Sequence, residues 1–287
     1  MGYIIDKVLL VGNGFNLVSD KGAGWNELLN RVAGEASTEH EEKVRKEKPF
    51  TLWFEELIRH SSATDIKQEI SKYLKECLEP NNHHVDLMNL GFTNILTTNY
   101  DYNLENSVGQ KWEKNHPAKE DYYSLFRRNS IGQQNVWHIH GELNTSKSIM
   151  LGHEQYSGYM QKIGSFLTSG VATEVKAREG RPYLSSFSGK KSKTKGDVPT
   201  WVDLFLEKEV HIIGFSFDYT ENHLWNLLMQ KEKLSRKYLS IGEIFYHRCS
   251  DHKQTTADEA KLSILTSLGA NIKDHVGSSY EKAYQVY

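Results

Sequence analysis

Four short motifs carry residues that could bind a nucleotide or transfer a proton. In the first, LLVGNGFN, an apolar run ends at Gly12, Asn13 and Gly14 and continues into Phe15 and Asn16. A strand that ends in Gly-x-Gly can turn tightly and approach a phosphate, whose charge is met by N–H groups at a helix start. Because position 17 is leucine, the third glycine of the dinucleotide fingerprint is absent, and a simple glycine turn is the alternative.

The second motif, ILTTNYD, places Thr98, Asn99 and Asp101 where a predicted strand ends. The carboxyl edge of a parallel sheet is where open α/β folds bind ligands. Asp101 could instead cap the helix that follows. Asn99 is harder to explain as a cap, because Thr98 could have capped that helix equally well.

The third motif, VWHIHGEL, contains His138 and His140, which strand alternation sends to the same face. Two such histidines could chelate a metal, but the sequence shows no further ligand cluster beside them, and we expect no metal. His140 precedes a glycine at a strand end. It could act as a general base, or it could be an ordinary hydrogen-bonded residue near the surface.

The fourth motif, VHIIGFSFD, repeats the logic of the first, with a buried strand and a turn at Gly214. Ser216 could hydrogen-bond a phosphate or a ribose. Asp218 or Thr220 could simply cap the helix predicted to begin near Glu221.

The elements that must position these motifs are short apolar strands alternating with helices, which is typical of an α/β fold with a mainly parallel sheet. Residues 25–90 have apolar residues at helical spacing and predict a helical insertion. Residues 179–200 are rich in Gly, Ser and Lys; they predict a surface loop, whose lysines are more simply explained by solvation than by phosphate binding. The predicted strands lie at residues 7–11, 94–98, 135–138, 148–151, 209–214, 243–246 and 271–274.

Composition excludes several classes of protein. The 287 residues include 35 Lys plus Arg and 37 Asp plus Glu, a net charge of −2, which argues against a basic nucleic-acid coat or a polyanionic tail. Two cysteines, Cys77 and Cys249, exclude a disulfide framework and a cysteine-based zinc site. We find no apolar run long enough for a membrane span and no signal-peptide pattern, and we predict a cytoplasmic protein.

Taken together, GNGF, TTNYD, HIHG and GFSFD resemble the motifs of the sirtuin-like family, above all its divergent prokaryotic branch, whose members hydrolyse NAD in defence against phage. The segment SIMLGHEQY at residues 148–156 resembles the strand and acidic-Tyr segment that follow HG in this branch. The opening GNGFN also resembles an abortive-infection family that begins GNGFD.

The resemblance implies a single Rossmann-like, three-layer domain over residues 1–287, with NAD as its substrate. It implies that Asn99 orders the nicotinamide ribose and a water, and that His140 is the catalytic base. The implied cofactor-binding residues are Gly12, Asn13, Gly14, Phe15, Asn16, Thr98, Asp101, Gly214 and Ser216.

The departures from the family pattern bear on the reaction. The four zinc cysteines of deacylating sirtuins are missing, which favours hydrolysis of NAD to nicotinamide and ADP-ribose. The glutamine usual before the catalytic asparagine is replaced by Thr98. The alternatives are an NAD-dependent deacylase or ADP-ribosyl transferase, and a non-catalytic NAD or ADP-ribose sensor. The family also implies a homo-oligomer or an assembly with a defence partner; we expect neither direct nucleic-acid binding nor membrane attachment.

Overall fold

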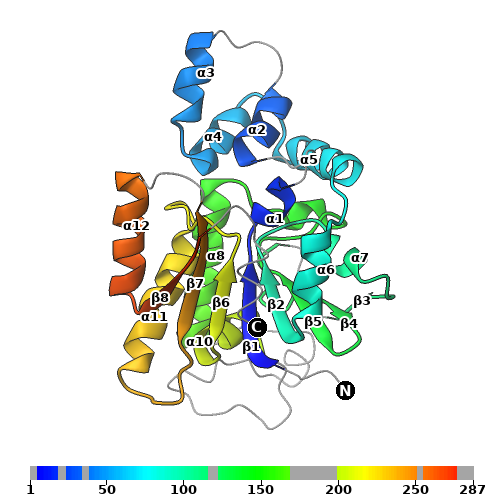
Figure 1. Cartoon of the computed structure of the whole chain (residues 1–287). Coiled ribbons are helices and arrows are strands. Elements are labelled where there is room, and N and C mark those ends of the chain that lie inside the picture. The colour runs from blue at the N-terminus through cyan, green and yellow to red at the C-terminus, as the bar shows by residue number, and fades with distance from the viewer. Residues whose placement is uncertain are drawn as a thin grey trace.

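The computed structural model describes residues 5–18, 24–33, 39–115, 122–168, 199–250 and 255–276. Residues 179–198 of the predicted surface loop lie outside these ranges. Within them, eight strands form one sheet in the order β3-β4-β5-β2-β1-β6-β7-β8 (Figure 1). The strands are β1 Ile5–Val11, β2 Phe92–Thr97, β3 Glu113–Lys114, β4 Arg128–Ile131, β5 Gln134–His138, β6 Val210–Ile213, β7 Ile244–Ser250 and β8 Ala270–Val276.

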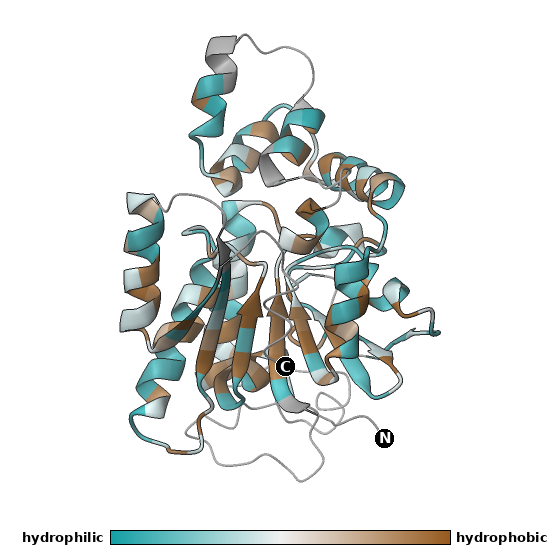
Figure 2. Ribbon diagram, in the orientation of Figure 1, coloured by the Kyte–Doolittle hydropathy of each residue, from teal (hydrophilic) through white to brown (hydrophobic). Residues whose placement is uncertain are grey.

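Six neighbouring strands, β5-β2-β1-β6-β7-β8 in sheet order, run parallel. The strands β3 and β4 are antiparallel and complete the edge beside β5. The predicted α/β fold with a mainly parallel sheet is therefore confirmed. The middle of the sheet is mainly apolar because both of its faces are covered, as Figure 2 shows. Every residue of β6 is buried.

Helices cover both faces and so make three layers. Alternate residues of β1 point to opposite faces: Val8 and Leu10 join the core beneath α8, α10 and α11, whereas Leu9 and Val11 pack with residues of α6. Figure 1 shows α6 and α8 on opposite sides of the sheet. These helices are α6 Asn82–Asn89, α8 His153–Thr168, α10 Trp201–Glu207 and α11 Asn222–Ser235, and α12 Thr256–Ser267 precedes β8.

The long connection between β1 and β2 is helical, as predicted. After the short α1 (Gly14–Leu17) the chain forms α2 Trp25–Ala33, α3 Glu39–Lys46, α4 Phe50–Leu57, α5 Ala63–Cys77 and α6. Figure 1 shows α2 to α5 beyond the carboxyl edge of the sheet, on the side where β1 and β2 end. None of the helices in the described ranges is long and apolar enough to cross a membrane.

One predicted strand is wrong and two strands were not predicted. Residues 148–151 are buried, and Ile149, Met150 and Leu151 form an apolar run like that of a core strand. Ser146–Ser148 instead forms a 3₁₀ turn, and Met150 donates one backbone bond to the carbonyl of His140 without joining a ladder. The unpredicted strands β3 and β4 are short and polar, RNSI in the case of β4, and lack an apolar run.

The register brings the ends of the central strands to one level. Val11 pairs with Thr97 on one side and with Ile213 on the other, Thr97 pairs with His138, and Ile213 pairs with His247. The residues that follow each strand therefore emerge at a single edge. This is the edge at which the four sequence motifs were expected to meet.

The ends of β1 and β6 approach each other closely at Gly12. A Cβ atom there would lie 2.4 Å from the carbonyl oxygen of Gly214 and 2.6 Å from the Cα of Phe215. Gly14 N–H donates to the Gly214 carbonyl over 2.9 Å. Gly214 has φ of 62°, and a Cβ atom there would lie 2.6 Å from the Phe15 ring. The two turns fit only without side chains at these positions.

We predict that Gly12→Ala destabilises the protein by about 1–3 kcal/mol, because the new methyl group meets backbone atoms that cannot rotate away. The matched control is Gly164→Ala in α8, where a Cβ atom would meet nothing within 4 Å. That control should stabilise the protein by up to about 1 kcal/mol through helix propensity. Urea unfolding of the two variants and the wild type measures both changes; equal stabilities would contradict the packing argument.

Candidate functional site

A cavity of about 350 Å³ lies at the carboxyl edge of the sheet. The chain leaves β1 toward β2 on one side and returns to β6 on the other, so the strand order reverses between β1 and β6. Open α/β sheets bind ligands in the crevice at such a switch point. The volume is within the range of small-molecule sites.

Five of the residues predicted to bind the cofactor line this cavity. They come from three motifs that are far apart in sequence, and the fold brings them together: Asn13, Gly14, Thr98, Gly214 and Ser216. Residues that the sequence did not single out for binding complete the wall, among them Phe215, Asp218, Glu221, His247 and Arg248. The end of β7, which carries His247 and Arg248, has no glycine turn or other motif that would have pointed to the cavity.

The other predicted residues are buried beside the cavity and do not line it. Asn16 donates to Asp101 Oδ2 over 2.8 Å and to Asn13 Oδ1 over 3.0 Å, which ties the first motif to the second. Asn103 donates its side-chain amide to Asn16 and its backbone N–H to Asp101 Oδ1. Burial raises the pKa of Asp101 although these hydrogen bonds oppose the rise. Asn16 and Asp101 therefore fix the loop that holds Asn13.

Asn99 also lies behind the cavity wall, with 6% of its surface exposed. Its side-chain amide donates to the Gly12 carbonyl over 3.2 Å, and its own carbonyl accepts from His138 Nδ1 over 3.0 Å. Asn99 thus connects the ends of β1, β2 and β5. Thr98, its neighbour, is the residue of this motif that reaches the cavity.

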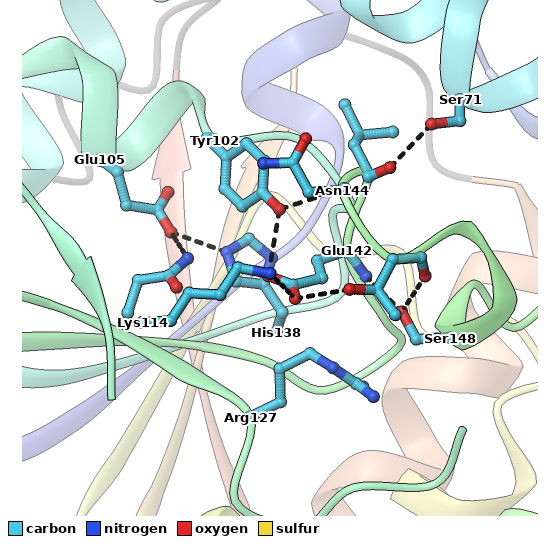
Figure 3. Close-up of polar contacts among 12 residues, drawn as sticks. Ser71, Tyr102, Glu105, Lys114, Arg127, His138, Glu142, Asn144 and Ser148 are labelled. Carbon is cyan, nitrogen blue, oxygen red and sulfur yellow. Dashed lines mark hydrogen bonds and ion pairs between the residues drawn. The ribbon is translucent and has the colours of Figure 1, made fainter. Parts of the chain in front are cut away.

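His138 and His140 do not form one site, because each has its own partners. His138 is fully buried, and its Nε2 lies 2.7 Å from Glu105 Oε1, which also accepts from Asn129 over 2.7 Å (Figure 3). Burial by itself would lower the pKa of His138. The Glu105 carboxylate outweighs it, and the pKa is raised. The raised pKa favours the protonated ring, in which both nitrogens donate, and the bond from Nδ1 holds Asn99.

The loop after His140 belongs to the same polar network. Figure 3 shows the carboxylate of Glu142 beside Tyr102 and Lys114. Tyr102 donates to Glu142 Oε2 over 3.1 Å and Lys114 to Oε1 over 2.5 Å. The backbone N–H of Glu142 donates to Ser148 Oγ. These contacts fix the path of the chain immediately after His140.

His140 belongs to a buried cluster with His223 and Glu221. His140 Nε2 lies 2.9 Å from His223 Nε2 and 3.4 Å from Glu221 Oε2. Burial lowers the pKa of His140 to about 3, lowers that of His223 well below its ordinary value, and raises that of Glu221 to about 8. The cluster is therefore uncharged near neutral pH, unlike the His138–Glu105 pair.

The three residues of this cluster offer ligand atoms within 4.8 Å of one another, which raises the question of a metal. The separation of 2.9 Å between the two Nε2 atoms is a hydrogen-bond distance, shorter than the roughly 3.3 Å between ligands on a tetrahedral zinc ion. Metal-bound histidines also donate their second ring nitrogen to an acceptor. Neither Nδ1 atom has a hydrogen-bond partner among the described residues. We therefore do not assign these residues as metal ligands.

Neither Glu221 nor His223 was predicted as a site residue; Glu221 was expected only as the start of a helix. Glu221 is the N-cap of α11, and His223 lies in its first turn. Nothing in the letters ENH distinguishes a helix start from a site. The partner of His223 is 83 positions away in sequence, and only the sheet brings them together.

A family model described as a SIR2-like domain matches residues 93–262, more than half of the chain. The chain belongs to the SIR2-like family. No curated protein matches it. SIR2-like domains use NAD as substrate, so the match fits an NAD-dependent enzyme. The SIR2-like region runs from β2 into α12 and contains three of the four motifs. The GNGF turn, which contributes Asn13 and Gly14 to the cavity, precedes it.

We predict that the His138–Glu105 pair makes the stability of this SIR2-like protein depend on pH. A raised pKa in the folded state means that the pair stabilises fully below the ordinary histidine pKa of about 6.5. This contribution is lost as the pH rises through the raised folded pKa. Glu105→Gln should cost about 3–5 kcal/mol at pH 6 and less at higher pH.

The measurement is the free energy of urea unfolding from pH 6 to 9. Subtracting the variant from the wild type isolates this pair from other titrating groups. The control is Glu113→Gln on the exposed strand β3, which should leave the curve unchanged. A constant difference between wild type and Glu105→Gln across the range would contradict the assignment.

Proposed function

We propose that this protein is an NAD⁺ glycohydrolase, which cleaves the bond between nicotinamide and ribose to give nicotinamide and ADP-ribose. The observation that supports this most is the cavity at the β1/β6 switch point. Residues from three of the family motifs line this cavity, and the buried Asn99 and His140 lie beside it. Membership of the SIR2-like family supports NAD as the substrate.

In this proposal the two ends of the dinucleotide meet different chemistry. The phosphates and the adenosine bind to the glycine turns and their neighbours, namely Asn13, Gly14, Gly214 and Ser216. Arg248, at the end of β7, supplies positive charge for the pyrophosphate. The conformation of the loop around Asn13 is maintained by the buried residues next to it, Gly12, Phe15, Asn16 and Asp101. Thr98 and Asn99 lie on the side of the nicotinamide ribose.

Cleavage produces an oxocarbenium-like ribose and requires a water at its open face. The side chain of Asn99, next to Thr98 in the wall, would order the ribose and that water. His140 would receive the proton that the water or a ribose hydroxyl loses. General-base help of this kind contributes typically about 10²–10⁴-fold to a rate.

Hydrolysis is favoured over deacylation because the chain has only two cysteines and so lacks the four-cysteine zinc module. We further propose that NAD depletion by this protein serves defence against phage, within the cytoplasm and in an oligomer or with a partner that restrains it. The motifs shared with the defence branch support this role.

We predict that the wild type converts NAD⁺ to nicotinamide and ADP-ribose and that Asn99→Ala slows this conversion at least about 100-fold, because the variant no longer orders the ribose and water. Chromatography of the products over time measures the conversion. Ser71→Ala is the control: it removes a buried hydrogen bond to the Leu143 carbonyl, away from the cavity, and should keep the wild-type rate.

Three other outcomes would contradict the proposal. Full activity of Asn99→Ala would remove the asparagine from the mechanism. NAD⁺ consumption only with an acylated peptide present would indicate a deacylase. Saturable binding with NAD⁺ recovered intact would indicate a sensor.

A further inference from the structure

Glu221 occupies the position between the cavity and the two buried histidines. It lines the cavity, although only 4% of its surface is exposed. His140 and His223 have no exposed surface and are not part of the cavity wall. Of the three clustered residues, the glutamate is the one that a ligand in the cavity can touch.

The turn that precedes α11 aims this carboxyl group. Gly214 and Phe217 both have positive φ, 62° and 52°, and Phe217 is fully buried against Trp225. The backbone N–H of Glu221 donates to the Asp218 carbonyl over 3.0 Å. A non-glycine residue rarely holds positive φ unless its surroundings enforce it, so the path from β6 to Glu221 is tightly determined.

The two histidines beside Glu221 each have a buried ring nitrogen without a hydrogen-bond partner among the described residues, His140 Nδ1 and His223 Nδ1. The Tyr156 hydroxyl, by contrast, lies at the Glu221 carboxyl group and hydrogen-bonds with it. Leaving a buried polar group without a partner costs about 1–3 kcal/mol, so two such atoms in one cluster are unusual in a site with a purely structural role. They indicate a place where a bound molecule or water completes the hydrogen bonds.

We propose that Glu221 is the catalytic carboxylate of the NAD⁺-hydrolysing site, touching the nicotinamide ribose and the attacking water, with His140 and His223 as the positioning residues behind it. This inference rests on the proposed function and refines it. Glu221 lies between His140 and the cavity and takes the place of His140 as the group that receives the proton, while His140 positions the glutamate.

The bond between ribose C1′ and the nicotinamide nitrogen breaks, and its electron pair stays on that nitrogen and cancels the ring's positive charge. The Glu221 carboxylate stabilises the oxocarbenium-like ribose, as carboxylates do in glycoside hydrolysis. The water oxygen bonds to C1′, and the proton that it loses moves to Glu221, which releases it to solvent through the cavity that it lines.

The surroundings of Glu221 determine when it can act as a base. The groups that face it are His140, His223, Tyr156 and Tyr100, with Asp218 on the turn before it. Burial, with the Asp218 charge adding to it, raises the pKa of Glu221 to about 8. A base must be deprotonated, so activity should rise with pH through this value.

The test is the pH dependence of NAD⁺ hydrolysis between pH 5.5 and 9.5. We expect kcat/KM of the wild type to rise with an apparent pKa near 8. The rise in kcat should come at lower pH, because the bound nicotinamide cation favours the carboxylate. Glu221→Gln should lower kcat about 10²–10⁴-fold and remove the rise. The dissociation constant for NAD⁺, measured by calorimetry at the low-pH end where the wild-type carboxyl group is also protonated, should change little.

Three further variants distinguish catalysis from a structural role. Glu221→Asp keeps a carboxylate and should retain the rise at a lower kcat. Asp218→Asn removes the neighbouring charge and should shift the rise to lower pH. Glu232→Gln, on α11 but paired with Arg236 away from the cluster, should behave as the wild type.

The outcomes that overturn the two proposals differ. A wild type that does not hydrolyse NAD⁺ overturns both. Wild-type kcat and an unchanged pH rise in Glu221→Gln, together with an inactive Asn99→Ala, overturn the assignment of Glu221 alone. One equivalent of a tightly bound metal in the purified wild type, lost in Glu221→Gln, would make Glu221 a ligand and overturn its role as base.

Discussion

The close approach of β1 and β6 at Gly12 and Gly214 is the constraint on which the rest of the site depends. It allows the turns after β1 and β6 to lie against each other, joined by the hydrogen bond from Gly14 N–H to the Gly214 carbonyl. The same turn presents the Gly12 carbonyl to Asn99 and thereby joins the second motif to the first. Without that approach the sheet would still form, but the two turns that line the cavity at the switch point would not lie together.

Two histidines separated by one residue end in opposite electrostatic states, and their partners decide which. His138 meets the carboxylate of Glu105 and is held charged, whereas His140 meets another imidazole and a carboxyl group that burial keeps protonated. The charged pair serves the architecture by holding Asn99. The neutral cluster includes Glu221, which lines the cavity, so in our proposal a bound ligand can change its charge.

Much of the fold followed from the sequence because buried parallel strands are apolar runs and their ends share an edge. That argument predicted that Gly14, Thr98 and Ser216 would meet, and they do line one cavity. It failed at residues 148–151, where Ile149, Met150 and Leu151 are apolar and buried without being part of the sheet. It also did not identify Glu221 and His223, because the contact between His140 and His223 spans 83 positions and produces no local sequence pattern.

If NAD⁺ binds in this cavity as we propose, the charges of the dinucleotide explain why an uncharged cluster suits the site. NAD⁺ carries an anionic pyrophosphate and a cationic nicotinamide, so a site that binds both ends needs positive charge near one and negative charge near the other. Arg248 is positive throughout, but Glu221 becomes negative readily only when a cation lies beside it, because burial otherwise favours its protonated form. The empty site would thus hold an acid that cannot accept a proton, and the arriving nicotinamide ring would itself generate the base that completes its removal.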